Sequence, residues 1–562
     1  MEQLITKWGE SLNTERVLQE YPRPQMVRNS YINLNGIWHC EIGENCEGKK
    51  PIYEGDILVP FSPESYLSGT GKIQIKENDR IIYTKIFKFP MDNKKGRVLL
   101  HFGAVDQTAK VLMNGVFVGG HNDGYLPFCC DVTAQIKKVN TLMVIVTDST
   151  EKSGLPRGKQ SSNRGGIWYT AQSGIWQSVW IECVTENYIK NVKFESRDNK
   201  YVKIIVNTNT TKNDFTAKIY DGEKLIGTAI GQNECEYEIE NAKLWTPETP
   251  NLYDVIIETS QGDKVKCYFA MRSYGVITDE NGFKRFALNG KQYFLKGILD
   301  QGYWPDGLYT APSDEAIIFD IKTAKLLGFN TIRKHIKIEP LRWYSHCDKL
   351  GIIVWQDFVN GGDNYNPLVV QLAGFAGANL KDNVYERTSA SKKEWRTAYE
   401  LHLNDTVELL YSVPCIAIYT LFNEGWGQFD ALKMEKILRN IDKFHLVDSA
   451  SGWFDQNGGD FKSLHIYYRK VKFTTDNRIL ALTEFGGYAL RVDNHMFNPQ
   501  KCFGYKLCKT LIEYKQSYQN LMENEVNTNI EKGLSAAIYT QLTDVEDEIN
   551  GIMTYDRKVI KL

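Results

Sequence analysis

The sequence predicts two β-sandwiches followed by a parallel (β/α)8 barrel, and three observations predict this order. The chain of 562 residues is too long for a single hydrophobic core, so several domains are expected. Short runs that alternate between apolar and polar residues fill the first half, which is typical of antiparallel sheets. From about Asn289 onward, apolar runs alternate with amphipathic segments, as in parallel strands joined by helices.

The first half is predicted to contain two sandwiches. Alternating runs such as "NTLMVIVTDST" are separated by Gly, Asn and Asp, and "MNG" at 113–115 predicts a hairpin turn. A break near Thr185 divides this half into a longer sandwich and a shorter one of immunoglobulin-like size, which ends at about Val276. We therefore expect domains at residues 1–184, 185–276 and 277–562.

The second half is predicted to form the barrel. "SDEAIIFDIKTAKLLG" predicts a capped amphipathic helix that ends at Gly328, and "EPLRWYSHCDKLG" predicts the next helix. The segment from Gly361 to Val413 is too long for one crossover and predicts an elaborated loop. The eight predicted strands lie in "YFLKGI", "FNTIRKH", "IIVWQDF", "CIAIYTLFNE", "LVDSASGW", "SLHIYY", "ILALTEF" and "LSAAIYTQLTD".

Composition limits the kinds of partner and the cell compartment that are expected for this protein. A net charge of -2 provides no attraction to nucleic acid or to a membrane surface. The eleven cysteines are odd in number and contain no CxxC pair, which favours reduced thiols. No stretch has the length and apolarity of a signal peptide or a membrane span. We therefore expect a cytoplasmic protein without a nucleic-acid or membrane partner.

Active sites of such barrels lie at the C-terminal ends of the strands, so the polar residues that follow each apolar run are candidates. A polar residue at a strand end is common, and any one of them has an ordinary structural explanation. Together they predict a ring of carboxylates, aromatic rings and an arginine at one end of the barrel. The candidates are Asp300, Arg333, His335, Asp357, Asn423, Glu424, Trp453, Tyr467, Glu484 and Asp544.

Two of these carboxylates stand out, Glu424 in "LFNEGWG" and Glu484 in "LTEFGG". Hydrolysis of a glycosidic bond needs one carboxyl group that protonates the leaving oxygen and a second that attacks the anomeric carbon or activates water. Both glutamates follow rigid apolar strands, and the glycines beyond them leave room for a substrate. The alternative is that both side chains point into solvent at the starts of loops.

The same motifs carry a resemblance. "FNE" after one strand and "TEFGG" after a later one resemble glycoside hydrolase family 2, the family of β-galactosidases, β-glucuronidases and β-mannosidases. The resemblance covers nearly the whole chain in the family's order and implies an N-terminal sugar-binding jelly-roll domain, an immunoglobulin-like domain and a catalytic barrel. It also rests on "YPRPQMVRNSYINLNGIWHCEI", "VPFSPESYLSG", "HFGAVDQTAKVLMNGVFVGGHNDGYLPF", "SGIWQSVWIE", "LWTPETPNLYDV" and "NGKQYFLKGI".

The resemblance implies roles for the central residues. Glu424 matches the family's acid/base, Glu484 its nucleophile, and Asn423 the residue that binds the sugar 2-hydroxyl. The implied reaction is double displacement with retention, with the two carboxyl groups about 5–5.5 Å apart. Tyr467 resembles the tyrosine that contacts the nucleophile, although Tyr468 is an alternative, and Arg333 matches the arginine that favours its ionised form.

Other positions are less specific. His335 shares a strand face with Arg333, and Asp357 is expected to bind a hydroxyl or to brace that arginine. Asp300 and Trp304 follow the first strand and are expected to hold sugar hydroxyls. Trp453 and Trp426 are candidates for stacking on a sugar, although packing under the barrel rim explains them equally well. Asp544 is expected to order the last loop of the barrel.

Departures from the family's pattern limit the substrate. "LDQGYWPDG" and "DFVNGG" lack the histidines and the carboxylate of the magnesium site in the familiar β-galactosidases, so we expect no metal and no cofactor. "NGIMTYDRK" lacks the spacing of the Asn-x-Lys element with which β-glucuronidases capture a carboxylate, which argues against a uronide.

These observations predict an exo-acting, retaining β-glycosidase that removes a terminal sugar from a small glycoside or oligosaccharide. A β-galactoside is the default substrate, because that activity is frequent in the family. The alternatives are a β-glycosidase for a mannoside, glucuronide or pentoside, and a carbohydrate-binding protein without catalysis. The second alternative has no need of two paired glutamates. A homo-oligomer is possible, but no interface is identified.

Overall fold

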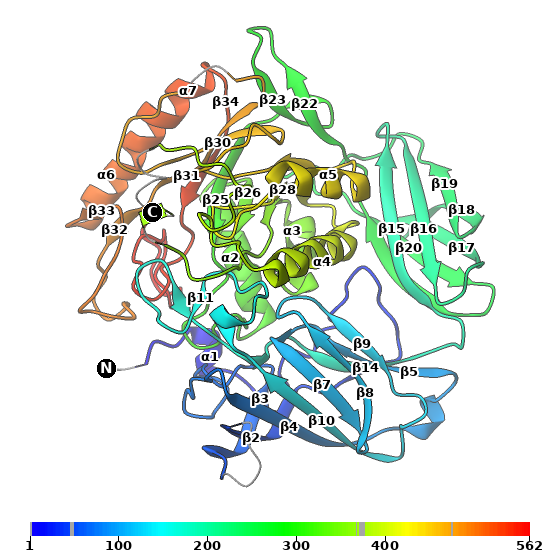
Figure 1. The fold of residues 1–562 in the computed structure, drawn as a ribbon. Helices are drawn as coiled ribbons and strands as arrows, with labels where there is room; N and C mark the ends of the chain where they lie inside the picture. Colours follow the sequence, from blue (N-terminus) through cyan, green and yellow to red (C-terminus); the bar gives the residue numbers. More distant parts are fainter. Residues whose placement is uncertain (1–2, 45–49, 367, 370–376, 474–475) are drawn as a thin grey trace.

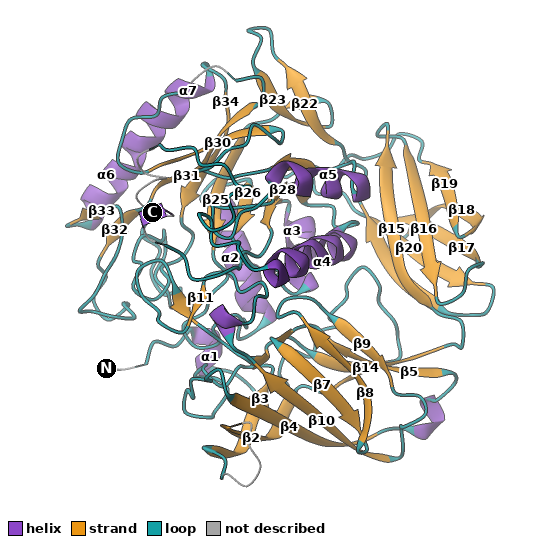
Figure 2. Cartoon of the chain, in the orientation of Figure 1, coloured by secondary structure: helices purple, strands orange, loops and turns teal. Residues whose placement is uncertain are grey.

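The computed structural model describes residues 3–44, 50–366, 368–369, 377–473 and 476–562. The parallel barrel occupies the centre of Figure 1, with the N-terminal strands below it and a second group of strands to its right. The long helices gather around the barrel, whereas the other two groups consist almost entirely of strands and loops (Figure 2). The predicted class of two β-sandwiches and a (β/α)8 barrel is confirmed.

The N-terminal sandwich packs a six-stranded antiparallel sheet, ordered β3-β2-β4-β10-β7-β8, against a four-stranded sheet, ordered β1-β14-β5-β9. Every second residue along β10 is buried, so one face of this strand supplies apolar side chains to the core between the sheets. The ten strands are β1 (Tyr31–Asn33), β2 (Gly36–Glu44), β3 (Tyr53–Val59), β4 (Asp79–Lys88), β5 (Arg97–Phe102), β7 (Thr108–Met113), β8 (Val116–Asn122), β9 (Phe128–Asp131), β10 (Val139–Thr147) and β14 (Val179–Val184).

The predicted hairpin turn joins β7 to β8, where Met113 pairs with Val116. Asn114 and Gly115 both have positive φ, at 54° and 83°, which the two-residue turn requires. Two short strand pairs extend the sandwich towards the barrel. They are β6 (Val105–Asp106) with β13 (Gly174–Ile175), and β11 (Gln160–Ser161) with β12 (Tyr169–Thr170).

The second sandwich is built from seven strands in the order β15-β16-β19-β18-β17-β20-β21. Between β18 and β19 only Gln232 and Glu234 pair, so the sheet folds over at this hairpin. Its core contains Ile204 of β16 and Val255 of β20. The strands are β15 (Ile189–Arg197), β16 (Tyr201–Thr208), β17 (Asp214–Asp221), β18 (Lys224–Gln232), β19 (Glu234–Glu238), β20 (Tyr253–Thr259) and β21 (Lys264–Phe269).

A small three-stranded sheet follows, formed by β22 (Tyr274–Thr278), β23 (Lys284–Leu288) and β24 (Lys291–Gln292). The domain boundary expected at Val276 falls inside β22 and therefore not between elements. Alternation of apolar and polar residues continues through this sheet, so the sequence pattern carries no mark of where the sandwich ends.

The barrel strands are all parallel, in the order β29-β28-β27-β26-β25-β34-β31-β30. The outermost two also meet, because the N–H of Asp460 donates to the carbonyl of Val447 at 2.7 Å, and this closes the sheet. Each strand overlaps one of the eight predicted runs, although β25, β30 and β31 extend one or two residues beyond theirs. The strands are β25 (Leu295–Asp300), β26 (Thr331–Lys334), β27 (Ile353–Asp357), β28 (Ile416–Thr420), β29 (Leu446–Asp448), β30 (Phe461–Ile466), β31 (Ile479–Gly486) and β34 (Leu534–Thr540).

The first helix after a barrel strand is capped as its sequence predicts. The Ser313 hydroxyl accepts from the N–H of Ala316 at 3.2 Å. The helix ends at Leu326, and Gly328 follows with φ +82°. Described residues form no α-helix between β29 and β30 or between β30 and β31. The helices are α1 (Lys7–Glu10), α2 (Asp314–Leu326), α3 (Leu341–Leu350), α4 (Lys393–Leu410), α5 (Ala431–Ile441), α6 (Leu511–Leu521) and α7 (Thr528–Ile530).

None of the helices in the described residues is both long and apolar enough to cross a membrane.

Candidate active site

Arg333 on β26 connects three other barrel strands. Its guanidinium donates from Nε to Asp357 at 3.0 Å, from Nη2 to Asn423 Oδ1 at 2.8 Å and from Nη1 to the Thr483 carbonyl at 3.0 Å. Nη1 also lies 3.4 Å from Glu484 Oε1. The Arg333 side chain is fully buried, and its planar fork fixes the relative positions of the residues around it.

Glu424 and Glu484 face each other across the C-terminal end of the barrel. Glu424 lies beyond β28 with φ 49°, and its N–H donates to the Ser451 carbonyl at 3.0 Å. Glu484 lies within β31. One oxygen of each carboxylate lies within 4.8 Å of the other, and both residues are more than nine-tenths buried. The sequence-based alternative, two solvated side chains at loop starts, is wrong.

His465 on β30 lies between the two glutamates. Its Nδ1 is 2.7 Å from Glu424 Oε1, and its Nε2 is 3.6 Å from Glu484 Oε1 and 3.1 Å from Ser451 Oγ. Our sequence analysis missed this residue. The signal was present, since His465 precedes Tyr467 by two positions and therefore shares a strand face with it.

Tyr467 is the tyrosine that contacts the candidate nucleophile. Its hydroxyl donates to Glu484 Oε2, and its ring stacks on that of Tyr505 with centroids 3.5 Å apart. The alternative, Tyr468, is 68% exposed. The alignment ambiguity between the two adjacent tyrosines is therefore resolved in favour of Tyr467 as the neighbour of Glu484.

The surroundings push the pKa values of the two carboxyl groups in opposite directions. Burial raises the pKa of Glu424, and the charge of Glu484 raises it further, against the hydrogen bond from His465. Burial also acts to raise the pKa of Glu484, but His465, His335 and Arg333 lower it to about 2. Glu424 is thus the better proton donor of the pair, while Glu484 stays ionised.

Asn423 presents one free donor to the site. Its Oδ1 accepts from Arg333, which fixes the orientation of the amide. The Nδ2 atom is buried and has no hydrogen-bond partner among the described residues. A buried donor without a partner is costly, so this atom is set up to bind a substrate oxygen.

Asp357 braces the site and lies behind it. Its carboxylate accepts from Arg333 and lies 2.7 Å from Nδ1 of His335. Of the two roles expected for Asp357, binding a hydroxyl or bracing Arg333, these contacts favour bracing. Burial, together with the positive charge of Lys159, lowers the pKa of His335 well below its ordinary value. A neutral His335 offers one ring nitrogen to Asp357 and keeps the other for a ligand.

In the described part of the chain, Glu424, His465 and Glu484 are close enough together to hold a metal ion. His465 already uses both nitrogens, on Glu424 and Ser451. Glu484 is likewise engaged by Tyr467 and Arg333. Hydrogen bonds between described residues thus already occupy most of these potential metal-binding atoms.

Trp453 lies beside the site, not within the group around Arg333. It lines a cavity of about 530 Å³ together with His465 and Tyr467, so an aromatic surface adjoins the two glutamates. Trp426 lies on the other side, where its ring is 6.3 Å from that of His335 and 5.0 Å from that of Trp168. Trp426 is 2% exposed and belongs to a buried aromatic cluster, so packing accounts for its position, while Trp453 lines the cavity beside the two glutamates.

Asp300 and Trp304 do not join the site, contrary to expectation. The Asp300 carboxylate pairs with Lys334 at 2.6 Å, and the Trp304 ring packs against Trp8 and under Arg557 at 3.9 Å. Asp300 ends β25 with its side chain turned to the outside of the barrel. The strand end was identified correctly, but the face of the strand was not.

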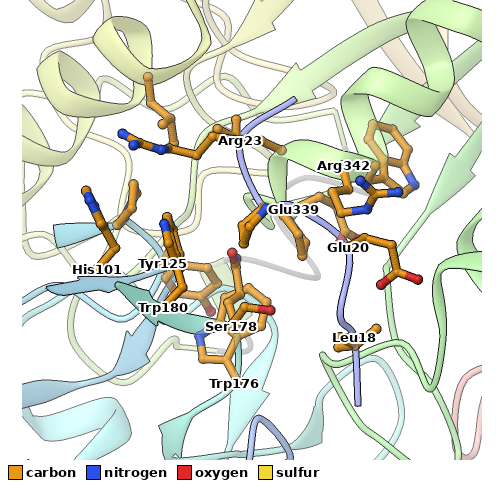
Figure 3. A pocket seen from close by; sticks show the side chains of 18 of the residues that line it. Leu18, Glu20, Arg23, His101, Tyr125, Trp176, Ser178, Trp180, Glu339 and Arg342 are labelled. Carbon is orange, nitrogen blue, oxygen red and sulfur yellow. The ribbon is translucent and has the colours of Figure 1, made fainter. Parts of the chain in front are cut away.

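Both residues instead line a second cavity, of about 510 Å³, between the N-terminal sandwich and the barrel. Figure 3 looks into it. One wall comes from the sandwich, and the others come from the start of α3 with the segment before it and from the N-terminal segment that carries Leu18, Glu20 and Arg23. The sandwich residues labelled there are His101, Tyr125, Trp176, Ser178 and Trp180, and the barrel residues are Glu339 and Arg342.

Comparisons with known proteins match three segments of the chain to models of one family. Residues 64–177 match the glycosyl hydrolase 2 galactose-binding domain-like model, residues 184–272 match glycosyl hydrolases family 2, and residues 280–496 match its TIM barrel domain. The three matches follow the order of the two sandwiches and the barrel.

Among curated relatives, a beta-galactosidase of Thermoanaerobacter pseudethanolicus is 26% identical over 294 residues, which are 49% of this chain and 39% of the relative. A putative beta-glucuronidase of Formosa agariphila is 25% identical over 392 residues, 66% of this chain and 34% of the relative. The chain therefore spans well under half the length of these two relatives.

Solved structures share the whole fold. A beta-glucuronidase from an uncultured Clostridium sp. superposes with a TM-score of 0.75 at 18% identity, covering 95% of this chain and 97% of that one. A GH2 beta-galacturonidase from Eisenbergiella tayi, bound to glycerol, gives a TM-score of 0.72 at 18% identity and covers 96% of both chains.

Proposed function

The chain belongs to glycosyl hydrolase family 2, and on this premise we propose that it is an exo-acting β-glycosidase that hydrolyses a terminal β-linked sugar with retention of configuration. The observation that carries the proposal is the pair Glu424 and Glu484. Their oxygens lie within 4.8 Å of each other, and their pKa values are displaced in opposite directions. One acid and one ionised carboxylate are the two groups that a retaining glycosidase needs.

In the proposed first step, Glu484 attacks the anomeric carbon and Glu424 gives its proton to the leaving oxygen. The glycosidic C–O bond breaks, and a glycosyl ester forms on Glu484. In the second step, Glu424 takes a proton from water, whose oxygen attacks the same carbon and releases Glu484. The short separation of the carboxylates favours this course over inversion, because an inverting site leaves room for water between them.

The surrounding residues have supporting roles in this proposal. Tyr467 and Arg333 hold Glu484 in its ionised form and aim it at the sugar. The free Nδ2 of Asn423 donates to the sugar 2-hydroxyl, a bond that strengthens as positive charge develops at the anomeric carbon. His465 orients Glu424 through Nδ1. His335 offers its second nitrogen to another hydroxyl.

For the sugar we propose a β-galactoside, the activity named for several of the curated relatives. A uronide is the second candidate, because the superposed structures are named as beta-glucuronidases and beta-galacturonidases. A mannoside and a pentoside remain further alternatives. A carbohydrate-binding protein without catalysis is the least supported, since it has no use for two glutamates with opposed pKa shifts.

The test is hydrolysis of a panel of aryl β-glycosides by the wild type and by Glu484→Gln. We expect the variant to lose at least about 10³-fold in kcat, because the nucleophile acts as part of a unit. Proton NMR of the first-formed sugar should show the β-anomer. Equal hydrolysis by wild type and variant, or an initial α-product, would contradict the assignment.

A further inference from the structure

One cation from the N-terminal sandwich reaches the candidate active site. Lys159 precedes β11, and the backbone beside it is anchored to the barrel, since the N–H groups of Arg157 and Gly158 both donate to the Asn360 carbonyl at 2.9 Å. Gly158 has φ +63°, and a Cβ there would lie 2.7 Å from the Ile336 carbonyl. Only glycine allows this close approach, so Lys159 is held firmly in place.

The side chain of Lys159 is nearly buried, and its amine lies among aromatic rings. Its Nζ lies 4.9 Å from the ring centroid of Trp426, 5.8 Å from that of Tyr169 and 6.0 Å from that of Trp168, and the residue is only 6% exposed. Trp426 is two residues beyond Glu424. The charge of Lys159 also acts to lower the pKa values of Glu424 and Glu484, so the amine lies close to both glutamates.

Lys159 differs from the other buried lysines. Lys334, Lys337 and Lys561 each contact a carboxylate at 3.0 Å or less. For Lys159, no described carboxylate lies within 4.0 Å of the amine, and no described residue accepts a hydrogen bond from it. An ammonium at the end of a nearly buried side chain, without an acceptor among the described residues, is available to a ligand that supplies one.

Glu548, in the loop after β34, is a third buried carboxylate close to the site. Tyr169, whose ring lies under Lys159, donates its hydroxyl to Glu548. The backbone of Glu548 pairs with Phe503, and Phe503 contacts Tyr505, the ring that stacks on Tyr467. Glu548 is 3% exposed and has no described cation within 4.0 Å.

The electrostatics agree with this placement. Burial raises the pKa of Glu548, the charge of Lys159 opposes that rise, and Glu484 adds to it. Glu548 is therefore near enough to feel both a cation and a candidate catalytic carboxylate, without contacting either. One oxygen of Glu548 accepts from Tyr169, and the other lies 3.4 Å from Nδ2 of Asn550, which leaves lone pairs for one further donor. A polar group between Lys159 and Glu548 could contact both.

We propose that Lys159 and Glu548 bind one hydroxyl of the terminal sugar between them, and that Glu548 thereby selects neutral sugars over uronides. This inference rests on the proposed function. A hydroxyl accepts from the ammonium and donates to the carboxylate, so it satisfies both groups at once. A uronate can accept from Lys159 but has no proton for Glu548, and it would add its own negative charge beside the carboxylates of Glu484 and Glu548.

The experiment compares two aryl glycosides that differ only at C6, a β-galactoside and the corresponding β-galacturonide. For the wild type we expect kcat/KM to favour the neutral glycoside by about 10²-fold or more. Glu548→Gln should reduce that ratio at least about tenfold, because the amide no longer repels the uronate. Lys159→Met should lower kcat/KM for the neutral glycoside by about tenfold or more.

A double variant tests whether one hydroxyl is shared. If Lys159 and Glu548 hold the same hydroxyl, the loss of kcat/KM on the neutral glycoside in Lys159→Met/Glu548→Gln should be smaller than the two single losses combined. Thermal unfolding of each variant shows whether it is folded. Glu400→Gln, which removes a carboxylate from an exposed ion pair with Lys433 on the barrel surface, is the matched control and should leave the ratio unchanged.

The outcomes separate this inference from the function on which it rests. A wild type that cleaves no aryl β-glycoside overturns the proposed function. A wild type that cleaves the glycosides but prefers the galacturonide overturns the selection by Glu548. The selection by Glu548 is also overturned if folded Glu548→Gln keeps the wild-type ratio of the two kcat/KM values, or if Glu400→Gln changes that ratio equally. Neither result affects the proposed retaining hydrolysis.

Discussion

Arg333 and Lys334 are neighbours on β26, yet they face opposite sides of the barrel wall. Arg333 points inward to Asp357, Asn423 and Glu484. Lys334 points outward, to Asp300 at 2.6 Å. Each is a fully buried cation between two carboxylates, so the two clusters are nearly the same in composition.

They differ in how completely the groups are satisfied. In the outer cluster, Glu339 bonds both Lys334 and Lys337, and two lysines balance two carboxylates at contacts of 3.0 Å or less. In the inner cluster, Glu484 is 3.4 Å from its guanidinium, and the amide of Asn423 keeps an unused donor. A closed cluster stabilises the fold, whereas an open one keeps groups available for a substrate.

The largest expected effect separates stability from activity. Lys334→Met leaves Asp300 buried without its cation and should reduce the free energy of unfolding by about 3–5 kcal/mol. Urea unfolding followed by tryptophan fluorescence should show a lower midpoint for the variant than for the wild type. Its kcat/KM, measured well below that midpoint, should equal that of the wild type. A large loss of kcat/KM in the folded variant would mean that the outer cluster also serves the reaction.

The inner counterpart should behave in the opposite way. Arg333→Met removes the permanent cation beside Glu484, and kcat should fall by about 10²-fold or more. The pKa of Glu484, now about 2, should rise, because Arg333 helps to lower it. The acid limb of the pH–kcat/KM profile therefore moves to higher pH. Arg333→Lys keeps the charge but lacks the fork, and should be intermediate. An unmoved acid limb would contradict the pairing.

This comparison also shows how far the sequence can be interpreted. All eight barrel strands were predicted, because buried parallel strands are continuous apolar runs. The strand-end candidates were mostly found, since barrel sites lie there. Asp300 was placed on the wrong side, because its face depends on the register between β25 and β26, which the apolar runs do not encode. Asp300 pairs with Lys334 and not with Arg333, so both side chains lie on the face away from the site.

The missed residues have a different cause. His465 was predictable from strand alternation with Tyr467. Lys159 and Glu548 were not, because their proximity depends on how the N-terminal sandwich docks against the last barrel loop. Contacts between segments nearly four hundred residues apart leave no local pattern, and the motifs of the barrel say nothing about the surface that meets it.

A smaller effect is expected at Asn423, the amide that Arg333 orients. Asn423→Ala removes the free Nδ2 donor, which should lower kcat by about 10–100-fold with little change in KM, because the bond strengthens in the transition state. The matched test uses a 2-deoxy aryl glycoside, on which wild type and variant should differ little. A variant that is equally impaired on both substrates would argue for a structural role.

The smallest expected effect is a displacement of the pH optimum, and it separates His465 from Arg333. His465 lowers the pKa of both glutamates, whereas Arg333 acts on Glu484. Glu424 must carry its proton, so activity is lost as pH rises through its pKa; Glu484 must be ionised, so activity is lost as pH falls through its own. His465→Leu should therefore move both limbs of the kcat/KM profile to higher pH, while Arg333→Met moves mainly the acid limb. If His465→Leu shifted only one limb, the histidine would serve one glutamate and not both.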